Sequence, residues 1–368
     1  MINQRNDERP AYTAPTRISH KRKLDAPVWS LKFQKYPVKE QKMKADKNKN
    51  QRQKIKYSFL KILTGSDLSR RRLPFMVIES VNPGPVVWLT GCIHGDEVTG
   101  IVTIQEVFKK IQRQPLRKGA IYAFPLMNPI GFEAGSRNIT ISREDLNRSF
   151  PGSKSGSLAE RIADKIFTTI EQTKPTLVLD LHNDWMKSIP YTVTDPNPMQ
   201  VNKQAYEKAG AAAEKSGFLV IHETEEIRRS FTYNLLAHNI PAITIELGES
   251  YIVNEINVQY GVNSIINILN YLDMFENKEE PFIFQVPDKI KGKSLRFVSE
   301  PVSSASGIIR FFAHPGDIVK KGQAVVKIYN TFGKLQDTVV CLHNGIVLGH
   351  SDSSVAYPGA PIMAFGAI

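Results

Sequence analysis

Strand-like and helix-like segments alternate from residue 57 to residue 275, and this alternation limits the fold more than any other feature of the sequence. Four apolar runs are typical of buried strands, because apolar residues follow one another without a period of two. Longer segments with apolar residues at helical spacing lie between and after them. The strand-like runs are 85–92, 119–129, 176–184 and 242–249, and the helical segments are 97–112, 157–172, 202–217 and 254–275. This order predicts an α/β fold in which helices flank a mixed, mostly parallel sheet on both faces.

Local signals place the boundaries of some of these segments. Ser157 is followed three residues later by Glu160, a capping box that predicts the start of a helix. Acidic side chains suit the positive end of a helix, so the helix over 97–112 is expected to open at Asp96 or Glu97. Two more apolar runs, 57–63 and 73–80, are expected to be strands on either side of a polar turn.

The chain is long enough for two folded domains. It has 368 residues, and single hydrophobic cores usually stop growing at about 250–300 residues. After residue 286, short β-type runs alternate with turn sequences such as PGD and HNG, which predicts a small all-β domain with a barrel-like fold. We therefore expect an α/β domain over 57–286 and a β-barrel-like domain over 287–368, preceded by an arm of 56 residues.

This arm carries nearly all of the net charge. The whole chain has a formal charge of +12, and residues 1–56 contribute +11, from 16 Lys and Arg against 5 Asp and Glu. A charge run with little hydrophobic pattern predicts a solvated, flexible segment. Two alternatives stay open: a weak contact with nucleic acid or anionic lipid, and a short packed strand through Trp29, Leu31 and Phe33.

Membrane, secreted and disulfide-rich classes are disfavoured. No apolar run reaches the ~18 residues that a membrane span needs, and the N-terminus has no apolar core of a secretory signal. We therefore expect a soluble protein of the cytoplasm. The two cysteines, Cys92 and Cys341, are too few for a disulfide framework or a Cys-type zinc module. Any metal site must use histidines and carboxylates.

Ionisable side chains gather where three of the predicted strands end. His94 and Glu97 follow the first strand at H-x-x-E spacing, His182 ends another and Glu246 ends a third. The carboxyl ends of parallel strands meet at one edge of a sheet, where α/β proteins bind their ligands. Two histidines and a carboxylate with an open fourth position suit catalytic zinc. A non-haem iron site has the same ligand types and stays an alternative.

A second group of polar residues follows the strand at 119–129. The loop from Gly135 to Gly152 contains three arginines, an aspartate and an asparagine: Arg137, Arg143, Asp145, Asn147 and Arg148. Asn and Arg beside a metal can bind an anionic substrate and an oxyanion. A surface salt-bridge cluster is the structural alternative.

Together, H-x-x-E, D-L-N-R with an upstream arginine, LDLH and IELGE resemble the zinc metallocarboxypeptidase-like proteins, and specifically their succinylglutamate desuccinylase/aspartoacylase family. The segments MNPIGFEAGSR and DLNRSFPG are most similar to deacylases of small N-acylated amino acids, such as the N-acetyl-diaminobutyrate deacetylases of ectoine breakdown. The likeness covers roughly residues 57–275. It implies a hydrolase that cleaves the amide bond of a small, anionic N-acyl substrate.

The resemblance also implies roles for individual residues. One zinc ion per chain would bind to His94, Glu97 and His182, and Glu246 would be the general base. Arg137 would polarise the scissile carbonyl. Arg143 is the alternative for this role, because the loop before D-L-N-R differs from the family pattern. Asn147 and Arg148 would bind a carboxylate of the substrate. Asp145 would orient His94. The strand period, and not the resemblance, places Asp180 on the same face as His182, so it is a second carboxylate candidate next to the metal, with an ordinary buried polar residue as the alternative.

Other functions remain in competition at this point. A metallocarboxypeptidase-like peptidase for short or unusual peptides is the second enzyme class, and a non-catalytic adaptor that binds polyanions through its arm belongs to another class.

In the C-terminal domain, GDIVKKGQAVVKI resembles a lipoyl- or biotinyl-like barrel, and Lys334 lies where such a domain holds its carrier lysine. The flanking sequence FGKL differs from the sequences that surround the modified lysine of such carrier domains, so we expect Lys334 to be an ordinary surface lysine. The sequence leaves the oligomeric state open.

Overall fold

The computed structural model describes residues 53–64, 68–198, 203–276, 279–351 and 353–368. Most of the predicted arm, including Trp29, Leu31 and Phe33, therefore lies outside the described residues. The end of the arm belongs to the folded body. Gln53 bonds to the backbone of Leu116 in both directions, at 2.9 and 3.0 Å, and Lys56 is the first residue of a strand.

The centre of the large sheet is parallel. Its four strands lie in the order β4 (Ala120–Phe124), β3 (Val86–Gly91), β5 (Leu177–His182) and β9 (Ala242–Glu246), and each neighbouring pair is parallel. The register places His182 directly opposite Glu246. Two of the predicted site residues thus meet at the carboxyl ends of adjacent strands.

The flanks of this sheet contain antiparallel pairs. On one side β2 (Arg70–Glu79) is antiparallel to β4, and β1 (Lys56–Thr64) is antiparallel to β2. On the other side β7 (Tyr191–Thr194) is antiparallel to β9, and β8 (Val220–His222) is parallel to β7. The mixed α/β sheet is confirmed, and its parallel character is concentrated at the centre.

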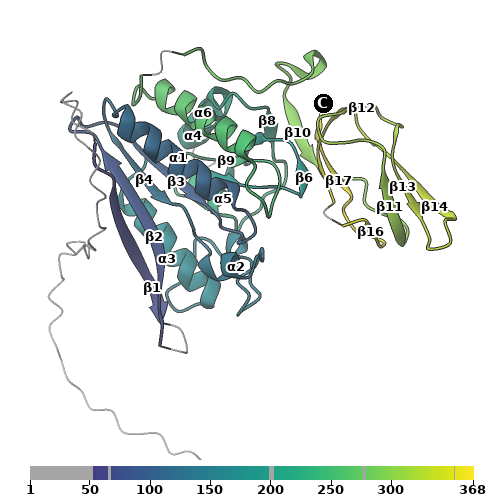
Figure 1. Cartoon of the computed structure of the whole chain (residues 1–368), viewed down its shortest axis with the longest axis horizontal. Helices are drawn as coiled ribbons and strands as arrows, with labels where there is room; N and C mark the ends of the chain where they lie inside the picture. Colours follow the sequence, from purple (N-terminus) through teal and green to yellow (C-terminus); the bar gives the residue numbers. More distant parts are fainter. Residues whose placement is uncertain (1–52, 65–67, 199–202, 277–278, 352) are drawn as a thin grey trace, which may run out of the picture. The chain divides into compact units, whose positions relative to one another are not determined.

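Helices pack on both faces of the sheet (Figure 1). On one face, α1 (Thr99–Arg113), α4 (Lys203–Lys215) and α6 (Glu255–Tyr271) bury their apolar sides in a common core with the central strands. On the other, α3 (Leu158–Gln172) and α5 (Phe231–Ala237) do the same. Two short helical turns, α2 (Pro129–Glu133) and η1 (Leu146–Arg148), lie in the connection after β4.

One predicted helix start is confirmed and one is wrong. The capping box is present, since Ser157 and Glu160 exchange both hydrogen bonds at the start of α3. The first helix, however, begins at Thr99 rather than at Asp96 or Glu97. The chain between β3 and α1 instead forms a turn, in which Glu97 N–H donates to His94 O at 3.2 Å. The Glu97 side chain contacts His94 and His182 and does not cap the helix.

The described residues after 286 contain strands and one short helical turn, η3 (Asp288–Ile290), and their strands contribute to two sheets. The strands β10 (Leu295–Val298), β17 (Met363–Ala367), β15 (Gly345–His350) and β12 (Ile318–Val319) continue the large sheet beyond β8. The strands β14 (Leu335–Val340), β13 (Ala324–Tyr329), β11 (Gly307–Phe311) and β16 (Val355–Ala356) form a separate sheet. A short strand after His182, β6 (Lys187–Ser188), pairs with β15. Strands from both sides of the predicted boundary at residue 287 therefore share one sheet, and the boundary itself stays a prediction.

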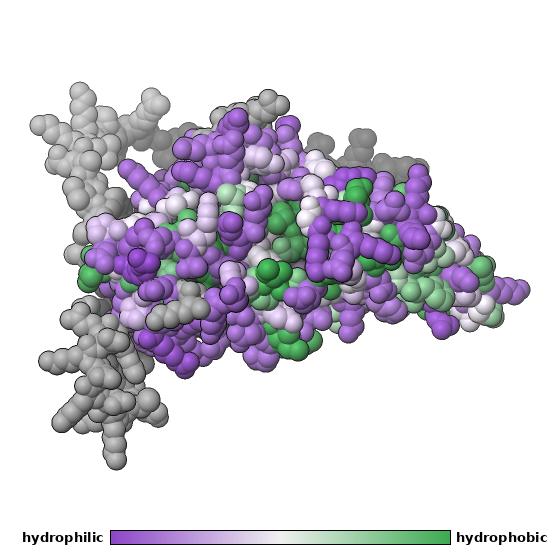
Figure 2. All heavy atoms as spheres, turned by 90° about the horizontal axis from the view of Figure 1, so that it is seen from above, coloured by the Kyte–Doolittle hydropathy of each residue, from purple (hydrophilic) through white to green (hydrophobic). Residues whose placement is uncertain are grey.

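The surface seen in Figure 2 is mostly hydrophilic, with hydrophobic side chains in separate spots. This agrees with the burial of the apolar runs in the cores on either side of the sheet. Among the described residues, no helix is both long enough and apolar enough to span a membrane.

Candidate metal centre

Two histidines and a glutamate converge at the carboxyl edge of the central strands. His94 and Glu97 lie in the turn between β3 and α1, and His182 is the last residue of β5. All three side chains are buried, and one ligand atom from each lies within 4.8 Å of the others. Glu97 is in the middle, with Oε1 2.5 Å from His94 Nδ1 and Oε2 2.9 Å from His182 Nδ1. The structure thus brings the three predicted ligands together.

The turn that carries His94 depends on a close backbone approach. Gly95 N–H donates to Ser136 O at 3.0 Å, so the turn lies directly against the α2 segment. A Cβ at position 95 would overlap the backbone of Gly131. Glycine is therefore required there for steric reasons, and it allows His94 to face Glu97.

The outer nitrogens of both imidazoles face carboxylates. His182 Nε2 lies 2.7 Å from Asp180 Oδ2, and Asp180 also accepts from Thr90 Oγ1 at 2.6 Å. His94 Nε2 lies 3.3 Å from Asp145 Oδ1, without the alignment of a hydrogen bond. A metal-binding histidine usually donates the N–H of its other ring nitrogen to a carboxylate or a similar acceptor. Each Nδ1 atom then faces one oxygen of the Glu97 carboxylate, so the donor set fits a divalent cation.

The electrostatics of the cluster favour a bound cation. Burial acts to raise the pKa of Glu97, but the adjacent imidazoles of His94 and His182 outweigh it and hold the pKa well below its usual value. Burial acts to lower the pKa of His182, and the carboxylates of Asp180 and Glu97 outweigh it and raise the pKa. Two buried carboxylates, Glu97 and Asp180, together with the part-exposed Asp145, thus favour positive charge around the two imidazoles, which a divalent metal would supply with the imidazoles neutral.

Arg137 reaches the cluster from the loop after α2. Its Nη1 lies 3.3 Å from His94 Nδ1 and 3.8 Å from Glu97 Oε1. Its Nε and Nη2 donate to Asp145 Oδ2 at 3.2 and 3.0 Å. Arg143 behaves differently: it is an exposed residue with a positive φ of 60°. Of the two arginines, the structure places Arg137 beside the candidate ligands.

Asp145 joins Arg137, His94 and the D-L-N-R segment. Its Oδ1 accepts from Asn147 N–H at 2.8 Å, so it caps η1. Burial acts to raise the pKa of Asp145, but His94 and Arg137 hold it well below its usual value. The carboxylate is therefore ionised, as a partner of both a guanidinium and an imidazole must be.

The predicted anion-binding pair lies on η1. Asn147 Oδ1 accepts from Phe231 N–H at 2.8 Å, which ties η1 to the start of α5. Arg148 is exposed and donates from Nη1 to Asn147 O at 2.8 Å. Asn147 thus has a structural contact in addition to its predicted role in carboxylate binding. The guanidinium of Arg148 lies at the surface, and its charge helps to lower the pKa of the Asp145 carboxyl.

Glu246 lies beside His182 with an uncommitted carboxylate oxygen. Its Oε2 is buried and has no hydrogen-bond partner. Burial raises the pKa of Glu246 well above its usual value, His182 opposes this shift, and Asp184, Glu97 and Asp180 add to it. A cation in the cluster would lower this pKa, because a nearby positive charge favours the carboxylate. The arrangement suits a proton acceptor next to a metal.

Two residues at this edge were not predicted from the sequence. Thr90 bonds to Asp180, and Asn183 contacts both the Glu97 side chain and the backbone after Glu246. These bonds join segments that are far apart in the chain, so the local sequence around Thr90 gives no signal for its contact. For Asn183, its position directly after a predicted ligand would have been the one available clue.

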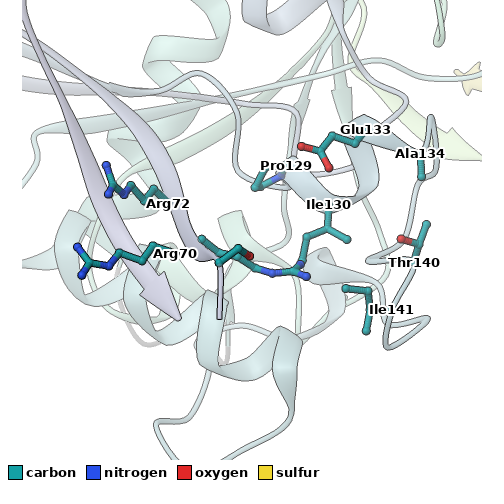
Figure 3. A pocket seen from close by; sticks show the side chains of 10 residues that line it. Arg70, Arg72, Pro129, Ile130, Glu133, Ala134, Thr140 and Ile141 are labelled. Carbon is teal, nitrogen blue, oxygen red and sulfur yellow. The ribbon is translucent and has the colours of Figure 1, made fainter. Parts of the chain in front are cut away.

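A surface groove of about 590 Å³ lies elsewhere, between the start of β2 and the α2 segment (Figure 3). Its walls include Arg70, Arg72, Ile130 and Ile141, and the side chains of Arg70 and Arg72 point away from the other labelled residues. None of the predicted ligands or substrate-binding residues lines it. The candidate chemistry is therefore at the sheet edge and not in this groove.

The fold and the site define a mixed α/β protein with a candidate divalent-metal centre at the edge of its sheet. The profile of the succinylglutamate desuccinylase/aspartoacylase catalytic domain matches residues 83–272. The chain belongs to this family, as the sequence motifs predicted, and the family places it among the amide-hydrolysing deacylases. The match contains every predicted ligand as well as Glu246.

Individual relatives agree with this assignment. The N-alpha-acetyl-L-2,4-diaminobutyric acid deacetylase of Halomonas elongata is 26% identical over 288 residues, which cover 75% of this chain and 80% of the relative. The product-bound structure of the ectoine utilization protein EutE from Ruegeria pomeroyi is 22% identical, with a TM-score of 0.72, and the match covers 85% of this chain and 95% of that one. A succinylglutamate desuccinylase from Silicibacter sp. TM1040 is 19% identical, with a TM-score of 0.71, over 85% and 94%. The two structures support the fold.

Proposed function

We propose that the chain is a zinc-dependent hydrolase that cleaves the amide bond of a small N-acylated amino acid or a related anionic amide. The observation that carries this proposal is the convergence of the Nδ1 atoms of His94 and His182 on Glu97, with Glu246 beside them. A buried set of three such ligands, which leaves the fourth coordination position of zinc to water or substrate, is what a hydrolytic metal site needs.

The metal in this proposal is zinc rather than iron. Both metals accept two histidines and one carboxylate. Hydrolysis of an amide needs no change of oxidation state, and zinc supplies Lewis acidity without redox chemistry. When bound to His94, Glu97 and His182, zinc would polarise the amide carbonyl and lower the pKa of its water ligand.

The residues of the chain would carry the remaining steps. Glu246 would accept the proton of the attacking water through its uncommitted Oε2 and pass it to the leaving amine. Arg137, held by Asp145, would donate hydrogen bonds to the oxyanion that develops on the carbonyl oxygen. Asn147 and Arg148 would bind the carboxylate of the substrate, with the guanidinium as the charged partner.

The substrate class rests on these cationic and donor groups together with the family. Arg137 and Arg148 favour an anionic substrate, and the name of the Halomonas elongata relative makes N-acetylated diamino acids the first compounds to test. Short peptides are the competing substrate class, since a carboxylate-binding arginine would also suit a peptide C-terminus.

Several narrower expectations remain predictions from the sequence: the cytoplasmic location, a polyanion contact of the arm, and a lipoyl-like C-terminal barrel.

For Lys334 we propose no carrier function. It lies in the turn between β13 and β14, two residues after Phe332, which is 88% exposed. The FGKL sequence around the lysine differs from the sequences that flank a carrier lysine.

A substrate panel tests the proposed function. Protein loaded with one equivalent of zinc would be assayed for release of the acyl group from N-acetyl and N-succinyl amino acids, with dipeptides alongside. We expect N-acyl amino acids to be preferred, and Glu246→Gln to keep its zinc while kcat falls by about 10²–10⁴. A preference for dipeptides, or near wild-type turnover in Glu246→Gln, would overturn the proposal.

A further inference from the structure

Asn183 connects three segments of the candidate site. It follows His182 directly and is only 4% exposed. Its backbone N–H donates to Glu97 Oε2 at 3.2 Å. Its Oδ1 accepts from Thr99 N–H at 3.2 Å. Its Nδ2 donates to Glu249 O at 2.8 Å, with Gly248 O and Leu247 O further away at 3.3 and 3.5 Å. One amide group thus binds the start of α1 on one side and the chain after β9 on the other.

The start of α1 depends on this contact because the helix has no cap of its own. The N-cap residue is Val98, whose side chain forms no capping hydrogen bond. The first N–H groups of a helix lack partners within the helix, and here Asn183 supplies an acceptor from a neighbouring strand. Since Glu97 lies two residues before Thr99, this bond anchors the segment that carries two of the proposed ligands.

The chain after Glu246 is held through its backbone. The Oε2 atom of Glu246 has no hydrogen-bond partner, so that oxygen does little to fix the side chain. Instead, Leu247 N–H donates to His182 O at 2.9 Å and Asp184 N–H donates to Gly248 O at 3.0 Å. Gly248 then turns the chain with a φ of +81°. The Asn183 amide binds the carbonyl groups of this same turn.

We propose that Asn183 is a positioning residue that holds the segment of Glu246 at a fixed place relative to the metal ligands. This inference rests on the proposed function, in which Glu246 is the general base. Asparagine suits the task because it offers an acceptor and two donors on a short side chain. Aspartate would keep the acceptor for Thr99 and lose both donors toward residues 247–249.

Three variants separate positioning from stability. Asn183→Ala removes both sides of the contact. Asn183→Asp keeps the acceptor for Thr99, and it replaces the donors by a charged oxygen that faces the carbonyl groups of residues 247–249. The matched control is Asn267→Ala on α6, where another amide bonds to a backbone segment through both ends: Nδ2 donates to Phe282 O at 2.8 Å and Oδ1 accepts from Phe282 N–H at 3.1 Å. Asn267 lies outside the proposed site, so its loss reports the stability cost of an amide contact alone.

We expect both Asn183 variants to bind one zinc ion per chain, because the three ligands remain. Their kcat should fall by about 10- to 100-fold, since small misplacements of a catalytic group have effects of this size. KM should change by less than about threefold, because substrate binding in the ground state does not use Glu246. The Asn267 control should lose thermal stability and keep its kcat. Wild-type kcat in Asn183→Asp, or an equal loss of kcat in the control, would overturn the proposal.

Hydrogen exchange gives a readout that needs neither a variant nor activity. In the unaltered zinc-loaded protein, the N–H groups of Thr99 and Asp184 should exchange much more slowly than that of Val253, which is exposed. Fast exchange at Thr99 would show that the contact with the Asn183 side chain is absent in solution and would refute the inference even if the variants do not fold. Wild-type protein that binds no zinc or hydrolyses no substrate would instead refute the proposed function.

Discussion

Nε2 of His182 lies 2.7 Å from Oδ2 of Asp180, two residues earlier on the same strand. Alternate residues of a strand share one face, so this pairing follows from the strand conformation of the L-D-L-H motif. With its proton on Nε2, His182 donates to Asp180 and directs the lone pair of Nδ1 toward Glu97. The carboxylate therefore selects the tautomer that a metal ligand requires.

Removing this carboxylate should weaken metal binding. We expect Asp180→Asn to raise the dissociation constant for zinc by about 10- to 100-fold, the usual effect of losing such a partner. A competitive titration with a chromophoric chelator would measure it, with Asp273→Asn, a surface carboxylate paired with Lys118, as the control. Equal zinc affinity in Asp180→Asn and wild type would show that Asp180 does not support the ligand.

The two arginines of the 135–152 loop should differ strongly in their effect on turnover. Arg137→Ala should lower kcat by about 10²–10³, the cost of losing one donor to an oxyanion. Arg143→Ala should change kcat little, because the Arg143 side chain is exposed and Arg137 already occupies the place beside His94 and Glu97. Steady-state kinetics on one N-acyl substrate would decide between them. The reverse order of effects would restore Arg143 to the oxyanion role.

Arg148 should affect binding more than chemistry. A carboxylate contact that is equally strong in the ground state and the transition state changes KM and leaves kcat nearly constant. We therefore expect Arg148→Ala to raise KM for an N-acyl amino acid and to have little effect on the corresponding uncharged amide. Arg161→Ala, an exposed arginine that bonds to Gly156 O, is the control. Equal losses on both substrates would indicate a structural function for Arg148.

Asp195 should make stability depend on pH. Burial raises the pKa of this carboxyl to about 6, whereas a free aspartate titrates near ~4. Since the folded-state pKa is the higher one, the ionised form is the destabilised form, and stability should fall as pH rises from about 4 to about 6. Asp195→Asn should therefore raise the free energy of unfolding by about 3 kcal/mol at pH 7.5 and hardly change it at pH 4. Denaturant unfolding at the two pH values would test this, and an equal gain at both would contradict it.

The parts of the fold that were predictable are those set by local pattern. Apolar runs without alternation marked the central strands, and the rule that parallel strands end at one edge was enough to group His94, His182 and Glu246. The position of Ser157 before Glu160 gave the start of α3 because a capping box involves only neighbouring residues.

The parts that were not predictable depend on contacts between distant segments. The bonds of Asn183 reach residues 84 and 66 positions away. The pairing of β10 with β8, which extends the large sheet into the C-terminal residues, joins Leu295 to Ile221. The choice between Arg137 and Arg143 depended on tertiary contacts, since the sequence does not reveal that Arg137 is the one that reaches His94 and Glu97.

The most direct test of the account is a zinc titration of metal-free protein during turnover. Chelator-treated protein would be titrated with zinc while hydrolysis of an N-acetyl amino acid is followed. We predict that activity rises linearly up to one equivalent per chain and then stays constant, and that His94→Ala and His182→Ala do not regain activity at that ratio. Full activity in the metal-free protein, or recovery of His182→Ala at one equivalent, would contradict the assignment of this cluster as the catalytic metal site.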